Sequence, residues 1–274
     1  MIYDQNLSLF YVEDSFHYDY MAALLKGIDP DAQLVSSKDG SSVVIWGWRH
    51  GCKLARNGKN VLIMELGYLG DRSEWTSLGW NGLNGYAKFY NDDVPNDRWV
   101  KYWKRGMKPW RGDTGGDYVL FCGQVISDQS LSDCPNYQFF VEEQLYRLRL
   151  TYGRVLFRPH PLMNRSADYY INIPRGIEVI DPTKTTITED MEKARFVVAW
   201  SSNSLVDAMY HGVPFISHSG GSMVHKYQKE NIFDEPDRET WGRRISYCQW
   251  TKEELRNGTA WQHVKIGLNP PPVL

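Results

Sequence analysis

The residues best suited to chemistry in this sequence follow two short apolar runs. Val155–Phe157 leads into Arg158-Pro159-His160-Pro161, and Phe196–Trp200 leads into Ser201, Ser202, Asn203 and Ser204. The two prolines hold the backbone extended, so His160 projects from the end of a predicted strand. The serines precede a predicted helix, whose first N–H groups and dipole attract an anion. The pattern predicts a phosphate site, although the same serines could only cap the helix.

Carboxylates follow two other apolar runs. Glu65 comes directly after the run 61–64, in Glu-Leu-Gly-Tyr-Leu-Gly-Asp, which ends at Asp71, and Asp14 comes after the run 7–12. Open α/β sheets bind ligands at the carboxyl ends of their strands. Glu65, Asp71 and Asp14 are therefore three candidate general bases. Each of them could instead be a surface or capping carboxylate.

A third group combines cationic and aromatic side chains. It comprises an expected loop at 46–51, a Gly- and Asn-rich stretch at 73–85 that we also expect to be a loop, and the run 98–111, in which six cations alternate with four aromatics. Such residues can stack on bases or sugars and meet phosphates. The alternative for the run is a solvated face that packs its Trp rings on the domain. The candidate acceptor-binding residues are Trp48, Arg49, His50, Trp75, Trp80, Lys101, Lys104 and Arg105.

The elements that must position these residues alternate between strands and helices, which predicts an α/β protein with two Rossmann-like, doubly wound domains. We expect an N-terminal domain at 1–111, a Gly-rich linker at 112–116, a second domain at 117–240 and two helices at 241–274. The predicted strands are 7–12, 33–35, 43–47, 61–64, 118–123, 155–157, 177–180, 196–200 and 213–217, and the predicted helices before the C-terminal pair are 16–26, 138–150, 189–194 and 204–210.

Composition narrows the class of protein. The chain has 274 residues, a formal charge of −2 and 14% aromatic residues, so no global basic field points to nucleic acid. Its four cysteines have neither zinc-site spacing nor a disulfide framework. No apolar run reaches the ~20 residues of a membrane span, and the first residues do not resemble a signal peptide. We expect a cytoplasmic protein.

Several motifs together resemble a known family. Arg-Pro-His-Pro at 158–161, Thr-Glu-Asp at 188–190, Ser-Ser-Asn-Ser at 201–204 and Gly-Val-Pro at 212–214 resemble the C-terminal half of glycosyltransferases of the two-domain B-type fold. The likeness covers about residues 117–235 and is greatest to bacterial capsular-polysaccharide transferases of the sialyl/Kdo type. These enzymes usually carry two adjacent acids before the Gly of their acidic motif. Here the adjacent acids are Glu13 and Asp14, which Ser follows instead.

The resemblance implies a site in a cleft between two domains, with the last helices crossing back to the N-terminal one. It implies a nucleotide-sugar donor as co-substrate, no other cofactor and no metal. The implied donor-binding residues are Gly123, Arg158, His160, Ser201, Ser202, Asn203, Ser204 and Lys226.

The acceptor is less well defined. Small B-type transferases that glucosylate phage DNA are similar in size and layout, and the run 98–111 favours a hydroxymethylated DNA base slightly over a glycan. For a phage-encoded protein the location would be the host cytoplasm. Two other classes stay open: a sugar-nucleotide epimerase or hydrolase, and a non-catalytic module that binds glycan or nucleic acid.

Overall fold

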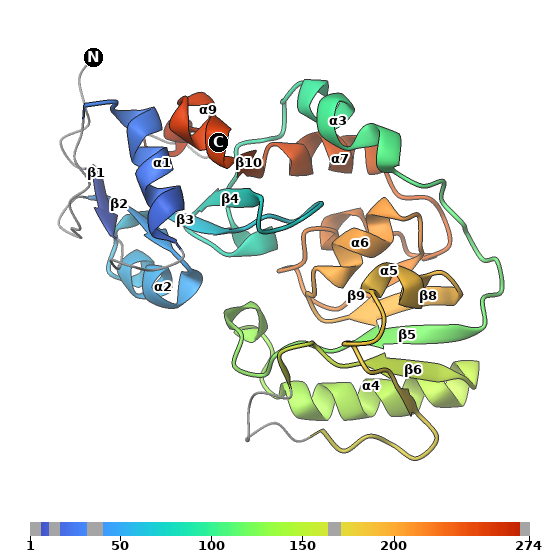
Figure 1. Cartoon of the computed structure of the whole chain (residues 1–274). Coiled ribbons are helices and arrows are strands. Elements are labelled where there is room, and N and C mark those ends of the chain that lie inside the picture. Colours follow the sequence, from blue (N-terminus) through green and yellow to red (C-terminus); the bar gives the residue numbers. More distant parts are fainter. Residues whose placement is uncertain (1–6, 11–16, 32–40, 164–170, 269–274) are drawn as a thin grey trace. The chain divides into compact units, whose positions relative to one another are not determined.

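The chain folds as two compact units. The computed structural model describes residues 7–10, 17–31, 41–163 and 171–268. The first unit combines residues 1–101 with 242–274, and the second contains 102–241 (Figure 1). The predicted linker at 112–116 lies inside the second unit. There Asp113 forms an ion pair with Arg195, at 2.7 Å, which ties this stretch to the strand that carries Arg195.

The first unit is built on a mixed five-stranded sheet with the order β1-β2-β3-β4-β10. β1, β2 and β3 are parallel, whereas β4 runs antiparallel to both β3 and β10. The strands are β1 (Leu7–Phe10), β2 (Ser42–Trp46), β3 (Asn60–Leu66), β4 (Trp75–Trp80) and β10 (Gln249–Thr251). The predicted strand at 33–35 lies outside the described residues.

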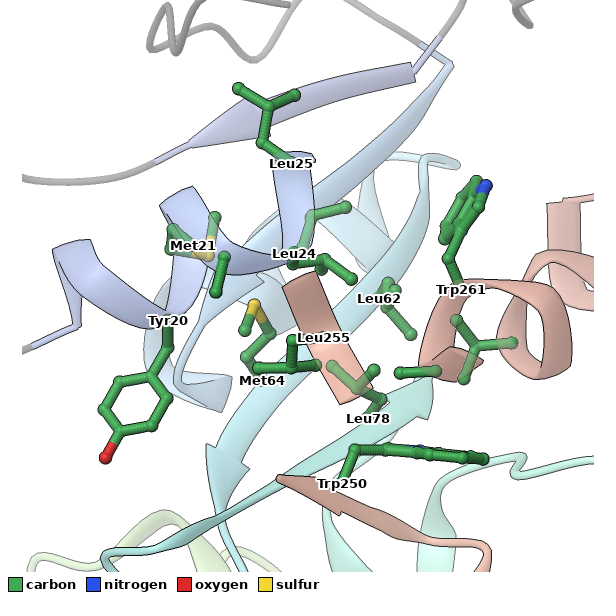
Figure 2. Packing of buried hydrophobic residues seen from close by; sticks show 14 of the residues in the cluster. Tyr20, Met21, Leu24, Leu25, Leu62, Met64, Leu78, Trp250, Leu255 and Trp261 are labelled. Carbon is green, nitrogen blue, oxygen red and sulfur yellow. The ribbon is translucent and has the colours of Figure 1, made fainter. Parts of the chain in front are cut away.

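Helices from both ends of the chain cover this sheet. Leu24 of the first helix and Leu255 and Trp261 of the C-terminal helices share one apolar core with Leu62 and Leu78 of the sheet, and Figure 2 shows these side chains together. The helices are α1 (Tyr18–Ile28), α2 (Trp48–Arg56), η1 (Asn84–Tyr86), α3 (Asp97–Tyr102), α7 (Arg238–Ser246), α8 (Lys252–Arg256), α9 (Thr259–Val264) and η6 (Lys265–Leu268).

Two expectations for this unit were wrong. The predicted loop at 73–85 contains β4, and all six residues of that strand are buried. The C-terminal segment contains β10 between α7 and α8, rather than two helices alone. A capping box begins α8, because Thr251 Oγ1 accepts from Glu254 N while the Glu254 carboxylate accepts from Thr251 N.

The second unit is built on a five-stranded, all-parallel sheet with the order β7-β6-β5-β8-β9. The strands are β5 (Tyr118–Cys122), β6 (Val155–Arg158), β7 (Glu178–Val179), β8 (Ala194–Ala199) and β9 (Phe215–Ser217). The helices are η2 (Lys104–Gly106), η3 (Gln129–Leu131), α4 (Tyr137–Tyr152), α5 (Ile187–Met191), α6 (Ser204–Tyr210) and η5 (His225–Tyr227). If these five strands are numbered 1 to 5 in chain order, their order across the sheet is 3-2-1-4-5. This is the doubly wound arrangement that the sequence predicted for this half.

Local signals fix the helices of this unit. Asn136 caps α4 by accepting from Phe139 N, and Thr186 and Glu189 form a capping box at α5. After α6, Gly212 adopts a φ of 70° and approaches the carbonyl of Pro109 so closely that a Cβ would clash with it. Gly212 therefore ends α6 and allows the chain to turn into β9.

Candidate functional site

The second unit has one place where its strand order reverses. β5 lies between β6 and β8, and the chain leaves β5 toward β6 and β7 but reaches β8 and β9 on the other side. Gly123 and Gln124 directly follow β5, and Ser201 lies just beyond the end of β8. Ligands of open α/β sheets bind outside the carboxyl ends of the strands at such a switch point. The geometry thus brings Gly123 and the predicted serine turn to one location.

A buried glutamine joins the two strand ends. Gln124 Oε1 accepts from Ser201 N at 2.8 Å, and Gln124 Nε2 donates to the hydroxyls of Ser201 and Ser130, both at 3.1 Å. Ser201 Oγ in turn donates to the carbonyl of Ser130. The backbone N–H of Ser201 is therefore committed to the protein. Sequence reasoning missed Gln124 as a site residue, and the only signal was its position directly after a predicted strand.

The rest of the serine turn begins α6. Ser202 and Asn203 are half-buried, and Ser202 Oγ accepts from Ser204 N at 3.3 Å. Ser204 is buried against the thiol of Cys122. Burial raises the pKa of Cys122 to about 12, which the nearby Ser204 hydroxyl only partly offsets, so this thiol stays neutral. Ser202 and Asn203 are the accessible part of the turn.

Arg158 has a different role from the predicted one. Its guanidinium is buried and forms an ion pair with Asp190, and it also donates to Thr185 Oγ1 at 3.1 Å and to the Thr185 carbonyl at 2.9 Å. Both terminal nitrogens are thus used inside the protein. The prediction that Arg158 binds the donor phosphate is corrected here: it links β6 to the start of α5.

His160 lies just beyond β6 and is half-buried. Its Nδ1 accepts from Leu162 N at 3.1 Å, which leaves the proton of the neutral ring on Nε2. His160 N also contacts Met163 Sδ at 2.9 Å. These bonds fix the ring, as the two prolines suggested. Lys226 is exposed in η5, with Nζ 5.3 Å from the ring centre of Tyr227.

A second polar network, not predicted from the sequence, follows β9. The Asp133 carboxylate accepts from Trp200 Nε1 at 2.8 Å and from Ser219 Oγ at 2.5 Å. Ser219 Oγ accepts in turn from Gly221 N. Asp133 therefore shapes the Gly-rich loop 218–222 and joins it to the end of β8. Burial, and then the nearby charge of His225, lower the pKa of His218 in this loop.

In the first unit, the Glu65 carboxylate lies next to Gly47, the residue that precedes α2. It sits near the end of β3, half-buried, and its Oε1 is 3.8 Å from the point that a Cβ on Gly47 would occupy. Gly47 separates β2 from α2 and has a φ of 81°. The Glu65 carboxylate thus lies where two parallel strands end, as expected for a residue that faces a substrate.

The loop after Glu65 is held in place by Gln249. The buried Oε1 of Gln249 accepts from Tyr68 N at 2.6 Å and from Leu69 N at 3.0 Å. Burial raises the pKa of Tyr68 well above its usual range, with smaller contributions from neighbours that include Cys248 and Glu65. Gln249 belongs to β10, so the C-terminal segment orders the loop between the two candidate acids, Glu65 and Asp71.

The other two candidate bases are in different situations. Asp71 is exposed, and its carboxylate accepts from Ser73 Oγ at 2.6 Å and from Ser73 N at 3.0 Å. These bonds lower the pKa of Asp71, which is typical of a turn-stabilising carboxylate and makes it a weak base. Asp14 lies outside the described residues.

The aromatic acceptor candidates are mostly core residues. Trp80 is 1% exposed and donates from Nε1 to the Val264 carbonyl at 2.8 Å, so its proposed stacking on an acceptor is corrected. Trp75 is also buried in β4. Trp48 is half-buried, packed against Ile63. Arg49 and His50 are exposed on the first turn of α2, which is a helix where a loop was expected.

The cation-aromatic run 98–111 is largely structural. Arg98 is buried, forms an ion pair with Glu254 and lies 4.1 Å from the ring centre of Trp250. Trp99 and Trp103 are also buried. Arg111 donates to three backbone carbonyls, those of Met191, Glu192 and Ala194. The packed alternative therefore describes this run better than an acceptor-binding surface does.

The cations of the run that remain at the surface are Lys101, Lys104, Arg105 and Lys108. Lys104 Nζ lies 3.2 Å from a carboxylate oxygen of Glu239. Within the described part of the chain, no group of three His, Cys, Asp or Glu side chains could hold a metal ion. None of the described helices is long and apolar enough to cross a membrane.

Comparisons with known proteins extend this description. No family model matches the sequence, and no curated protein matches it. The fold is similar to that of two solved chains from Thermosulfurimonas dismutans. One is the KpsC beta Kdo 2,4 transferase, with a TM-score of 0.57 and 12% identity over 88% of this chain and 90% of that one. The other is the KpsC beta Kdo 2,7 transferase, with a TM-score of 0.56 and 14% identity over 93% of this chain and 98% of that one. The α/β fold is thus one that known glycosyltransferases use.

Proposed function

We propose that this protein is a glycosyltransferase that moves a sugar from a nucleotide-sugar donor to a hydroxyl of a glycan. The observation that carries the proposal is the switch point of the second sheet, where Gln124 joins the Gly123 turn to the serine turn. The donor nucleotide would bind there, with Ser202, Asn203 and His160 near its phosphate. The fold shared with two Kdo transferases supports the same class of reaction.

Transfer needs a base for the acceptor hydroxyl and donors for the leaving phosphate. Glu65 is the best candidate base because it lies at a strand end, whereas Asp71 is the acceptor in a local Ser turn. On the phosphate side, His160 is oriented with its proton on Nε2. Arg158 has no part in this chemistry, since its charge is neutralised by Asp190. The proposed reaction requires no metal.

A glycan is a better acceptor than DNA for this chain. The preference for DNA rested largely on the run 98–111, and the buried positions of Arg98, Trp99 and Trp103 weaken that support. The names of the two Kdo transferases that share this fold also point to sugar chemistry.

A transfer assay tests the proposal. A panel of radiolabelled nucleotide sugars is incubated with the protein alone, with oligosaccharides, and with a hydroxymethylpyrimidine DNA duplex. Label that moves only onto an oligosaccharide supports the proposal. Release of label without an acceptor would indicate a hydrolase or epimerase, transfer to the duplex would restore the DNA acceptor, and binding without turnover would indicate a non-catalytic module.

A further inference from the structure

Helix α2 carries a strongly cationic exposed face. Arg49, Lys53 and Arg56 are all exposed, and their spacing of four and three residues places them on one side of the helix. His50 is exposed beside Arg49. We call Arg49, Lys53 and Arg56 the cationic face of α2. It extends over about two turns, or roughly 10 Å, of helix.

Nothing nearby in the sequence neutralises this charge. No Asp or Glu occurs between Ser41 and Met64 in a chain whose formal charge is −2. In the described ranges, no ion pair joins Arg49, Lys53 or Arg56 to another side chain. Like charges one turn apart destabilise a helix slightly. A local concentration of cations of this kind is therefore suited to an external anion.

The other side of α2 is already occupied. Trp48, Leu54 and Ala55 pack against Ile45, Val61 and Ile63 of the sheet, and Gly51 lies so close to Ile63 that a Cβ would clash with it. A helix that binds at a membrane interface inserts its apolar side among the lipids. The apolar side of α2 is not available for this, so its cations can act only by charge and hydrogen bonding.

The cationic face begins beside Glu65. Gly47, two residues before Arg49, is the residue next to the Glu65 carboxylate. A chain whose terminal hydroxyl reached Glu65 could continue along Arg49, Lys53 and Arg56, because all of these residues belong to one unit and to adjoining elements. The anion that fits is therefore a linear polymer with repeated negative charges.

We infer that the cationic face of α2 binds the body of an acidic glycan acceptor. Nucleic acid fits less well, because Trp48, the one indole on α2, is half-buried against the sheet and offers little ring surface for base stacking. The inference rests on the proposed function only for the statement that the bound polymer is the acceptor. Its binding to the polymer can be measured without turnover.

The test compares two triple variants of the full chain. Arg49→Gln, Lys53→Gln and Arg56→Gln remove the cationic face. The control, Arg175→Gln, Lys193→Gln and Lys229→Gln, removes the same charge from exposed positions of the second unit. Binding to fluorescent oligosialic acid is measured at low and high salt. Uncharged dextran, duplex DNA and vesicles containing phosphatidylglycerol are run beside it.

The wild type and the control are expected to bind oligosialic acid more tightly than the other probes, and high salt should weaken that binding. The cationic-face variant should bind about tenfold more weakly, which corresponds to about 1.4 kcal/mol. Equal binding by the two triple variants would overturn the inference, as would a preference for DNA or vesicles. If binding follows the expectation but no transfer occurs, the proposed function fails and the binding surface remains.

Discussion

The side-chain amide of Gln124 bonds both the backbone N–H and the hydroxyl of Ser201, a residue 77 positions further along the chain. One buried side chain thus fixes the distance between the ends of β5 and β8. In a parallel sheet, the loops beyond those ends have no ladder hydrogen bonds of their own. Gln124 supplies bonds in their place and sets the shape of the predicted donor site.

Gln124→Ala should therefore destabilise the protein. The substitution leaves Ser201 N without its acceptor in a buried position, and we expect a loss of about 2–3 kcal/mol in the free energy of unfolding. Urea denaturation measures this loss. Gln144→Ala, on the half-buried side of α4, is the matched control and should change stability little. Equal stabilities for the two variants would mean that water replaces the amide.

Arg158→Met tests the structural role of that residue. Removing one partner of a buried ion pair leaves Asp190 uncompensated and should cost about 3–5 kcal/mol, much of which Arg158→Met with Asp190→Leu should restore. Arg154→Met is the control, because Arg154 pairs with Glu178 at the surface, where ion pairs contribute little to stability. Thermal unfolding compares the three. A stable Arg158→Met protein that loses only nucleotide binding would instead support a role for Arg158 in donor binding.

Glu65→Gln should reduce transfer about 100-fold or more while donor affinity stays nearly constant. The amide keeps the size of the side chain but cannot accept the proton of the acceptor hydroxyl. Asp71→Asn should retain most of the turnover, because Asp71 serves the Ser73 turn. The two variants are compared by turnover at saturating donor. The reverse ranking would identify Asp71 as the base.

His160→Ala combined with Ser202→Ala should weaken nucleotide binding by about 2–5 kcal/mol. Both side chains lie at strand ends of the second sheet and carry polar atoms suited to phosphate. Isothermal titration calorimetry with nucleoside mono- and diphosphates measures the change. His211→Ala, at the C-terminal end of α6 in the same unit, is the control. Unchanged affinity in the double variant would place the nucleotide elsewhere.

The ion pair between Glu254 and Arg98 predicts an acid-sensitive fold. Burial alone would raise the pKa of Glu254, but hydrogen bonds from Arg98 and Thr251 outweigh it and hold the pKa below the ordinary 4.5. The folded state thus binds this proton less readily than the unfolded state does. The resulting stability is present above the unfolded pKa and is lost as the pH falls through the folded one.

The measurement is the free energy of unfolding between about pH 6 and about pH 3. The wild type should lose stability on acidification more steeply than Glu254→Gln, which has no proton to bind at this position. Asp92→Asn, at an exposed ion pair with Arg244, should behave like the wild type. Parallel pH curves for the wild type and Glu254→Gln would contradict the assignment.

The sequence predicted the second unit better than the first. Its strands are short apolar runs bounded by Gly, Pro and Ser, and α6 begins and ends where the spacing placed it. β4 was missed because it is buried on both faces and contains Thr76, Ser77 and Gly79, so it shows neither alternation nor a purely apolar run. β10 was missed because its three residues pair with β4 from far along the chain.

The candidate site was predictable in position and less so in detail. The rule that ligands bind at strand ends selected Glu65, His160 and the serine turn, and all three lie at or just beyond the end of a strand. It could not indicate whether Arg158 faces a ligand or a buried Asp190, because that depends on a contact made only after folding. The hydrogen bonds of Gln124 and Asp133 could not be predicted from the sequence either, because their partners are distant in sequence.

The first sheet obtains its last strand from the C-terminal segment, and this has a consequence for how the protein is made. During synthesis the residues 102–241 leave the ribosome as one continuous stretch and can fold as soon as β9 and its loops have emerged. β4 cannot pair along its second edge until β10 has been synthesised, and the loop at Tyr68 cannot form its hydrogen bonds to Gln249 until then. The nascent chain can therefore complete its second unit first, while the first unit still has the edge of β4 unpaired.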